Sequence, residues 1–294
     1  MASRGFDCRV SHVIPAFLGA FLALNTSLAG QQERAASRPL PDIKQLFSTV
    51  QENQKQIESL VDQYSCAENE EIRVLDKNGR VKKSIVKEYE DFYLGGQLVR
   101  RVVKKDGRPL SPAAQKKEDD RIEKRIREYE KNHSEEGEDA ARKKKEQIDI
   151  STFLRISNFS HPRWGEYRQH DMIVFDFVPN PDYKPRNKTE DLLHKLAGTI
   201  WVDDQARDVA RLEAHLSDTF KLAGGLLASI HKGGSLVMEQ AKTNDEVWLP
   251  SYVEAHFSAR LLLVASALGD YTSKFSDYKK FRVETMQVTL KNKK

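Results

Sequence analysis

Residues 198–216 read GTIWVDDQARDVARLEAHL, and this stretch decides the fold class. In its first half Ile200 and Val202 point one way and Trp201 and Asp203 the other. In its second half polar residues alternate with an apolar set, namely Ala210, Leu212, Ala214 and Leu216. Strict alternation with a period of two is typical of an antiparallel strand with one face in water. The stretch therefore predicts two strands joined by a tight polar turn.

Similar patterns on both sides of this hairpin predict an antiparallel sheet of roughly ten strands, nearly all paired with their neighbours in sequence. Further strands are expected at residues 70–75, 81–94, 97–104, 172–178, 222–230, 235–242, 246–257 and 281–290. The pairs Gly95-Gly96 and Gly233-Gly234 are expected at turns, because glycine adopts the positive φ that twisted hairpins require.

Helical patterns interrupt the strands. Asp42 can cap a helix that runs to about Tyr64, with apolar residues close to a 3.6-residue period. Shorter helical pieces are expected near residues 150–156, where one could cover an open sheet, and at residues 189–196. Ser111-Pro112 opens a highly charged segment that lasts to about residue 147. It is interpreted either as a solvated helical excursion from the domain or as a docking surface for a partner.

The N-terminal segment has the features of an export signal. Arg4 and Arg9 precede an apolar run that ends near Leu28 and Ala29, the pattern of a cleaved signal peptide. An uncut membrane anchor is the alternative, and no cysteine follows the cleavage site to carry a lipoprotein anchor. We expect a signal peptide over residues 1–29, a flexible linker over 30–41, and one domain over 42–294 with a helical insertion at about 111–147. The protein is therefore expected to be exported.

Composition narrows the class of protein. The chain has 294 residues, of which 39% are hydrophobic and 31% charged, and its net charge is +4. That charge is too small and too dispersed to predict nucleic-acid binding. After removal of residues 1–29 the single cysteine is Cys66. It is interpreted as a small buried residue, or alternatively as a reactive thiol or an intermolecular disulfide.

No catalytic apparatus is evident from the sequence. The eight histidines are scattered without a His-x-x-x-His pair, and Cys-x-x-Cys is absent, so no metal site is predicted. A Gly-x-Ser-x-Gly elbow and a phosphate-cradling glycine loop are also absent. We therefore expect a protein that is not an enzyme and that uses no cofactor. A hydrolase with an unrecognised site is the weakest alternative.

Several of these features together resemble the LolA/LolB-like lipoprotein-localisation superfamily. They are an export signal, a first amphipathic helix, an antiparallel meander, and a Gly-x-x-Trp-Val-Asp motif followed by Arg-x-Glu on the returning strand. In this chain the motif residues are Gly198, Trp201, Val202, Asp203, Arg211 and Glu213, and the later stretch 247–250 (VWLP) fits as well. The charged insertion at 111–147 lies outside the minimal pattern of that superfamily.

The resemblance implies an α+β fold, in which one strongly curved antiparallel sheet forms a half-open β-barrel with helices over its concave side. It also implies a periplasmic binder or carrier of lipid or lipoprotein acyl chains. The alternative on the same fold is an envelope regulatory or protein-interaction module that uses the charged helix. Our candidates for the acyl-binding face are apolar residues of the predicted strands: Phe175, Phe177, Leu212, Leu216, Met238, Val253 and Phe257. Ordinary core packing is the competing explanation for each of them.

Overall fold

The fold was analysed in a computed structural model, which describes residues 38–294 apart from 95–96, 133–149, 223–227, 262–264 and 281–294. Five predictions therefore lie wholly or partly outside the described residues: the signal peptide, most of the linker, the Gly95-Gly96 turn, the strand at 281–290, and the end of the charged segment. The chain divides after Pro39, and the residues from Leu40 onward form one compact unit. No helix among the described residues is long and apolar enough to cross a membrane.

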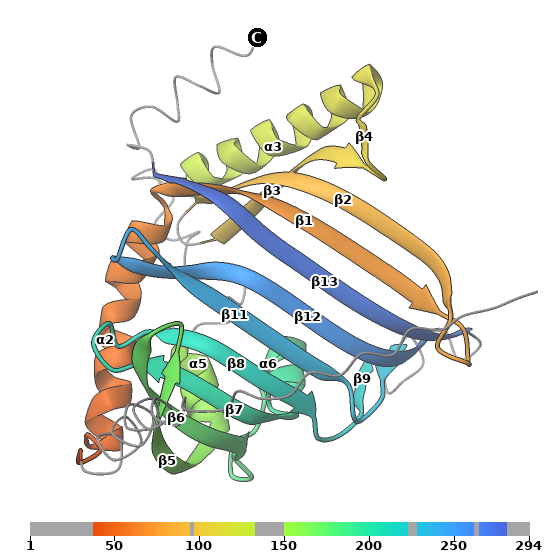
Figure 1. The fold of residues 1–294 in the computed structure, drawn as a ribbon. Helices are drawn as coiled ribbons and strands as arrows, with labels where there is room; N and C mark the ends of the chain where they lie inside the picture. The colour runs from red at the N-terminus through yellow and green to blue at the C-terminus, as the bar shows by residue number, and fades with distance from the viewer. Residues whose placement is uncertain (1–37, 95–96, 133–149, 223–227, 262–264, 281–294) are drawn as a thin grey trace, which may run out of the picture. The chain divides into compact units, whose positions relative to one another are not determined.

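An antiparallel sheet with thirteen strands among the described residues dominates this unit (Figure 1). The helices are α2 (Ile43–Val61), α3 (Pro112–Asn132), α5 (Ile150–Ile156) and α6 (Lys188–Leu193). The first group of strands is β1 (Tyr64–Leu75), β2 (Val81–Leu94), β3 (Gln97–Lys105) and β4 (Arg108–Pro109). The second group begins with β5 (Ser157–Tyr167), β6 (His170–Pro179), β7 (Leu196–Asp203) and β8 (Val209–Leu216). It continues with β9 (Phe220–Leu222), β10 (Ala228–Ile230), β11 (Ser235–Thr243), β12 (Val247–Leu261) and β13 (Ala265–Lys280).

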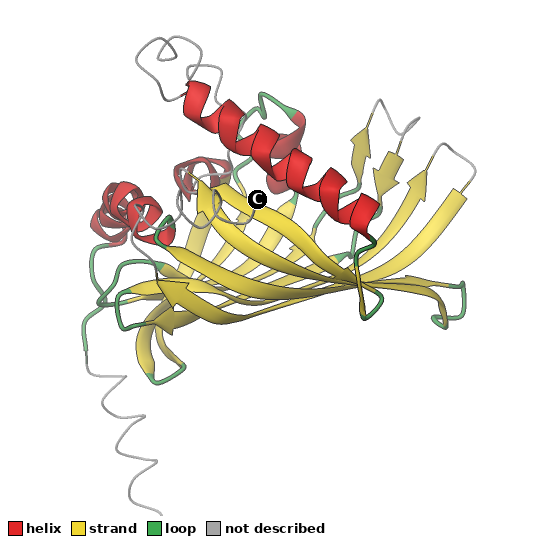
Figure 2. Cartoon of the chain, turned by 90° about the horizontal axis from the view of Figure 1, so that it is seen from above, coloured by secondary structure: helices red, strands yellow, loops and turns green. Residues whose placement is uncertain are grey.

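The strand order is β4-β3-β2-β1-β13-β12-β11-β8-β7-β6-β5, with β10 beside β12 and β9 beside β10. The sheet thus consists of two meanders, one before α3 and one after α5. Within each, most neighbours in space are neighbours in sequence, as predicted. The pairing of β1 with β13 joins the two meanders. The sheet is open and curved (Figure 2), which confirms the predicted curved antiparallel architecture.

The hairpin at 198–216 forms as predicted, with one correction. Ile200 and Val202 are buried in the main hydrophobic core, while Trp201 lies on the other face, where its ring centroid is 5.5 Å from the Arg211 guanidinium. The correction concerns Ala210. A bulge shifts the register so that Val202 pairs with Val209, and Ala210 joins a second cluster that contains Trp248. A bulge of this kind is invisible to a strict period-two pattern.

The main core lies between one face of β6–β8 and three helices. We call this face of the sheet the inner face and the opposite face the outer face. Leu46 and Val50 of α2 and Phe153 of α5 pack there against Phe175 and Ile200, together with apolar residues of α6. In α2 the apolar residues recur at helical spacing, and Asp42 accepts a hydrogen bond from the backbone N–H of Gln45 at 2.8 Å, as a capping residue does.

Helix α3 is fixed to the edge strand β3. Ile122 is 3% exposed and packs with Phe92 and Val99 on the outer face. Glu118 Oε1 accepts a hydrogen bond from the backbone N–H of Val102 at 2.8 Å, and Arg121 donates to the backbone carbonyl of Arg100. The helix side chains thereby satisfy polar groups that an open sheet edge leaves unpaired. The described part of the charged segment is thus packed on the sheet, in contrast to a purely solvated excursion.

Two strands were not predicted, and one prediction was only partly right. Strand β13 was missed because it is rich in small and polar residues, and β5 was missed because Pro162 and Gly165 weaken its pattern. Pro162 sits at a bulge between the paired residues Ser160 and Arg163, on an outermost strand. The predicted strand at 222–230 is instead the antiparallel pair β9 and β10.

The contact between β7 and β8 is closest at Gly198. A Cβ atom placed there would lie 1.9 Å from the Glu213 carbonyl oxygen and 2.8 Å from Ala214 Cα. We predict that Gly198→Ala lowers the free energy of unfolding by about 3 kcal/mol, because backbone atoms cannot yield as a side chain does. Urea unfolding followed by circular dichroism measures this. The matched control is Gly165→Ala, whose Cβ would meet only a methyl group of Val174. An equal loss in the two variants would contradict the prediction.

Candidate functional site

An apolar row crosses the inner face beyond the helix-packed core. Its register is continuous: Leu236 pairs with Ala255, Ala255 with Tyr271, Tyr271 with Ile72, and Ile72 with Ile85. Directly paired residues share a face of the sheet. Leu236 also pairs with Ala214 of β8, so this end of the row adjoins the main core. All five side chains are half-buried. We call this row, with Met238, Val253 and Phe257 beside it, the apolar strip.

The seven candidate residues fall into two groups. Phe175, Phe177 and Leu216 are at most 4% exposed and belong to the main core, with Leu212 packed at its border. The other three lie on the apolar strip: Met238, Val253 and Phe257.

Within the described part of the chain, these last three residues belong to none of the hydrophobic core clusters. Met238 is 37% exposed, and the Phe257 ring lies over Gly269, leaving no room there for a Cβ atom. The role of all seven residues in acyl binding stays a prediction.

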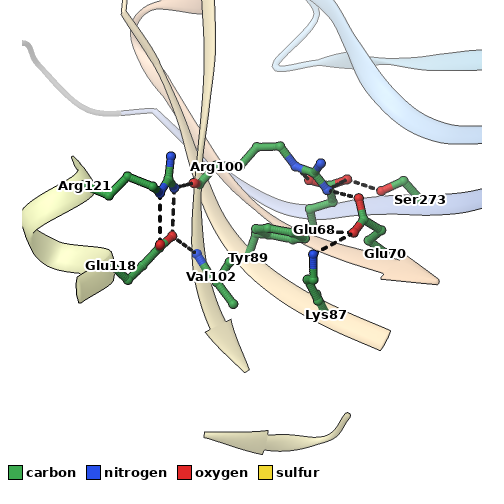
Figure 3. Close-up of polar contacts among 9 residues, drawn as sticks. All are labelled: Glu68, Glu70, Lys87, Tyr89, Arg100, Val102, Glu118, Arg121 and Ser273. Carbon is green, nitrogen blue, oxygen red and sulfur yellow. Dashed lines mark hydrogen bonds and ion pairs between the residues drawn. The ribbon is translucent and has the colours of Figure 1, made fainter. Parts of the chain in front are cut away.

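A cluster of charged side chains borders the strip on β1, β2, β3 and β13 (Figure 3). Arg100 contacts Glu68 Oε2 through Nε at 2.6 Å and Glu70 Oε2 through Nη2 at 2.6 Å. Its guanidinium lies 3.9 Å from the Tyr89 ring centroid, and the Tyr89 hydroxyl donates to Glu70 at 2.8 Å. The Ser273 hydroxyl of β13 donates to Glu68. The cluster therefore links the two meanders through side chains as well as backbone.

The cluster holds more acid than base. Glu68, Glu70 and Asp91 are each at most 4% exposed, and Arg100 contacts the first two. Burial and the adjacent Glu68 raise the pKa of Asp91 to about 8, and neither of its carboxyl oxygens has a hydrogen-bond partner. Burial also favours the neutral form of Glu70, but hydrogen bonds from Arg100 and Tyr89 outweigh this effect and lower the pKa of Glu70. A protonated Asp91 thus relieves the local excess of negative charge.

Cys66 lies on β1 directly opposite Asp91 on β2. It is buried and reduced, and burial, followed by the charge of Asp91, raises the pKa of its thiol to about 12. A thiol that stays protonated is a poor nucleophile. These observations favour the interpretation of Cys66 as a small core residue.

The sequence did not reveal this charged cluster, because its members come from strands far apart in the chain: Glu68 and Ser273 are 205 residues apart. A carboxylate at every second position, as in Glu68 and Glu70, was the one signal available. Among the described residues, no three or more His, Cys, Asp or Glu side chains are arranged to hold a metal ion. The geometry offers an apolar surface with a polar, ion-paired border.

Asp91 makes stability depend on pH. In the unfolded chain its carboxyl ionises near pH 4, whereas in the folded protein it keeps its proton up to about pH 8. The folded state binds more protons between these values, so its stability falls as the pH rises from about 4 to about 8. We predict that Asp91→Asn removes this loss. The substitution should therefore be about 1–3 kcal/mol more favourable to the free energy of unfolding at pH 8.5 than at pH 4.

Urea unfolding at the two pH values measures the difference. The exposed Asp120 of α3 provides the control Asp120→Asn, which should show no such pH-dependent gain. A gain for Asp91→Asn that is the same at pH 4 and pH 8.5 would show that its ionisation does not matter.

Solved structures match the greater part of this chain. No protein-family model and no curated protein matches the chain. A LolA superfamily protein from Nitrosomonas europaea matches at 10% identity over 80% of this chain and 93% of its own, with a TM-score of 0.31. A DUF1329 family protein from Desulfovibrio piger matches at 10% identity over 82% and 94%, with a TM-score of 0.31. One matched structure thus belongs to the superfamily that the sequence resembles. A TM-score of 0.31 supports no conclusion about function, which must be inferred from the residues of this chain.

Proposed function

We propose that the inner face binds an acyl chain along the apolar strip, and that the protein is a non-enzymatic binder or carrier of lipid. The observation that supports this is the row Leu236–Ala255–Tyr271–Ile72–Ile85, in which five consecutive strands each present an apolar, half-buried side chain. Leu236 packs at the border of the main core, whereas the other four residues lie outside the core clusters of the described residues. Apolar side chains that are left partly exposed in this way gain from an apolar cover.

The length of the row suits an acyl chain. Five strands spaced about 4.8 Å apart extend the row over about 19 Å. With C–C bonds of about 1.5 Å in zigzag, an extended chain of roughly fifteen methylene groups covers the same distance. Beside the row, the Phe257 ring fills the space over Gly269 and adds apolar surface to the strip.

The expected binding energy suits a carrier. Full burial is worth about 0.8 kcal/mol per methylene, so a dozen methylenes half covered by the sheet gain about 5 kcal/mol before ordering costs. Such binding is weak enough to be reversible.

The charged residues Glu70 and Lys87 border the strip and would keep a polar head group at that margin in water. The predicted export signal over residues 1–29 would place this activity in the periplasm, where a lipid needs an apolar cover to cross water.

The interaction-module alternative has less support. It relied on the long charged helix, for which a pure carrier has no evident use, whereas Ile122, Glu118 and Arg121 of α3 contact strand β3. These contacts give α3 a structural task in covering the sheet edge. The acyl-binding proposal is therefore the one that the described contacts favour.

Two substitutions on neighbouring strands test the proposal. Ile72 is the fourth of the five residues in the row, and Val86 lies on the outer face, where it pairs with Glu71. Both are β-branched and half-buried. We predict that Ile72→Lys weakens binding of a fluorescent C16 fatty acid at least about tenfold, since one charge disrupts the apolar contact, whereas Val86→Lys leaves it within about twofold.

Fluorescence titration measures the binding, and circular dichroism establishes that both variants are folded. Unchanged fatty-acid binding by folded Ile72→Lys would exclude the apolar strip as the binding surface.

A further inference from the structure

A separate polar pocket lies at the end of the sheet where β9, β10 and β12 meet α6. Its volume is about 580 Å³, which is within the range of small-molecule sites. Four cationic side chains line it: Lys188, Lys195, Lys221 and Arg260. Two carboxylates, Asp191 and Asp218, also line it, which leaves a net charge of +2 with His231 neutral. No part of this pocket belongs to the apolar strip.

One wall of the pocket is a row across three strands. Ser229 of β10 pairs with Lys221 of β9 on one side and with Arg260 of β12 on the other, so the three side chains project from the same face. Ser229 is 2% exposed, and its hydroxyl has no hydrogen-bond partner. The Nε atom of Arg260 is likewise buried and without a partner. Buried polar atoms are normally hydrogen-bonded, so the Ser229 hydroxyl and Arg260 Nε are available to hydrogen-bond a ligand.

The other charged residues of the pocket lie in α6, just after it and just before β9, and their charges balance one another. Asp191 accepts from Lys195 at 2.7 Å and from Lys188 at 3.3 Å. Asp218 accepts from the backbone N–H of Thr219. Within the described residues, Lys221 and Arg260 form no ion pair with a carboxylate. The unbalanced charge of the pocket therefore lies on the same wall as the unpartnered hydroxyl.

We infer that this pocket binds the phosphate group of an anionic phosphate ester, with Arg260, Ser229 and Lys221 as its donors. A guanidinium, a hydroxyl and an ammonium in one row supply the charge-assisted hydrogen bonds that a tetrahedral oxyanion accepts. The volume leaves room for the alcohol part of the ester. The phosphate can belong to a soluble ester or to a lipid head group. This inference does not depend on acyl-chain binding by the strip.

Calorimetric titration of the full chain with glycerol 3-phosphate tests the first source, and co-sedimentation with phosphatidic acid vesicles tests the second. Arg260→Met should weaken binding about tenfold or more, and Lys221→Gln about threefold. Lys221 is exposed, so its variant tests the site without risk to the fold. The control Lys117→Gln removes the same charge from the exposed surface of α3 and should change binding less than about twofold.

Binding of glycerol 3-phosphate that depends on Arg260 and Lys221 would establish a site open to soluble esters. Binding to vesicles alone, with the same dependence, would establish a site for lipid head groups. The inference is overturned if neither probe binds, or if Lys117→Gln weakens binding as much as the two pocket variants do.

Discussion

The pairing of β1 with β13 is the contact on which the rest of this structure depends. It joins two meanders that are separated in sequence by α3 and α5, and each meander would otherwise end in an open edge. Side chains reinforce it: Ser273 of β13 contacts Glu68 of β1, which Arg100 of β3 holds in turn. Because Glu68 is buried, loss of Arg100 would leave an uncompensated charge, which is costly in a protein interior.

The same pairing creates the candidate binding surface. Leu236, Ala255 and Tyr271 belong to the second meander, and Ile72 and Ile85 belong to the first, so the apolar strip becomes continuous only when the two meanders meet. On one part of the inner face the helices α2, α5 and α6 pack against the sheet, and the charged cluster lies on another part. The strip between them combines an apolar surface with partial exposure, and this combination is what the proposed lipid-binding function requires.

The elements that could be predicted from sequence are those whose own residues carry the signal. Helix α2 has helical spacing, and β7 and β8 alternate with a period of two apart from their bulge. Strand β13 could not be found this way, because Gly269, Ser273 and Ser276 favour a strand only between two partners. The alternation also identified apolar faces without showing where the helices dock. Phe175 and Met238 share a face of the sheet, yet the first is under α2 and the second is exposed.

Photoaffinity labelling is the most direct measurement of lipid binding on the inner face. The purified protein would be irradiated with a fatty acid that carries a diazirine along its chain, and the labelled peptides would be identified by mass spectrometry. Binding on the apolar strip predicts labels on β11, β12, β13, β1 and β2, at inner-face positions such as Ala255 and Ile72, and their suppression by excess unlabelled fatty acid. Labels confined to other segments, or labels that unlabelled fatty acid does not suppress, would contradict it.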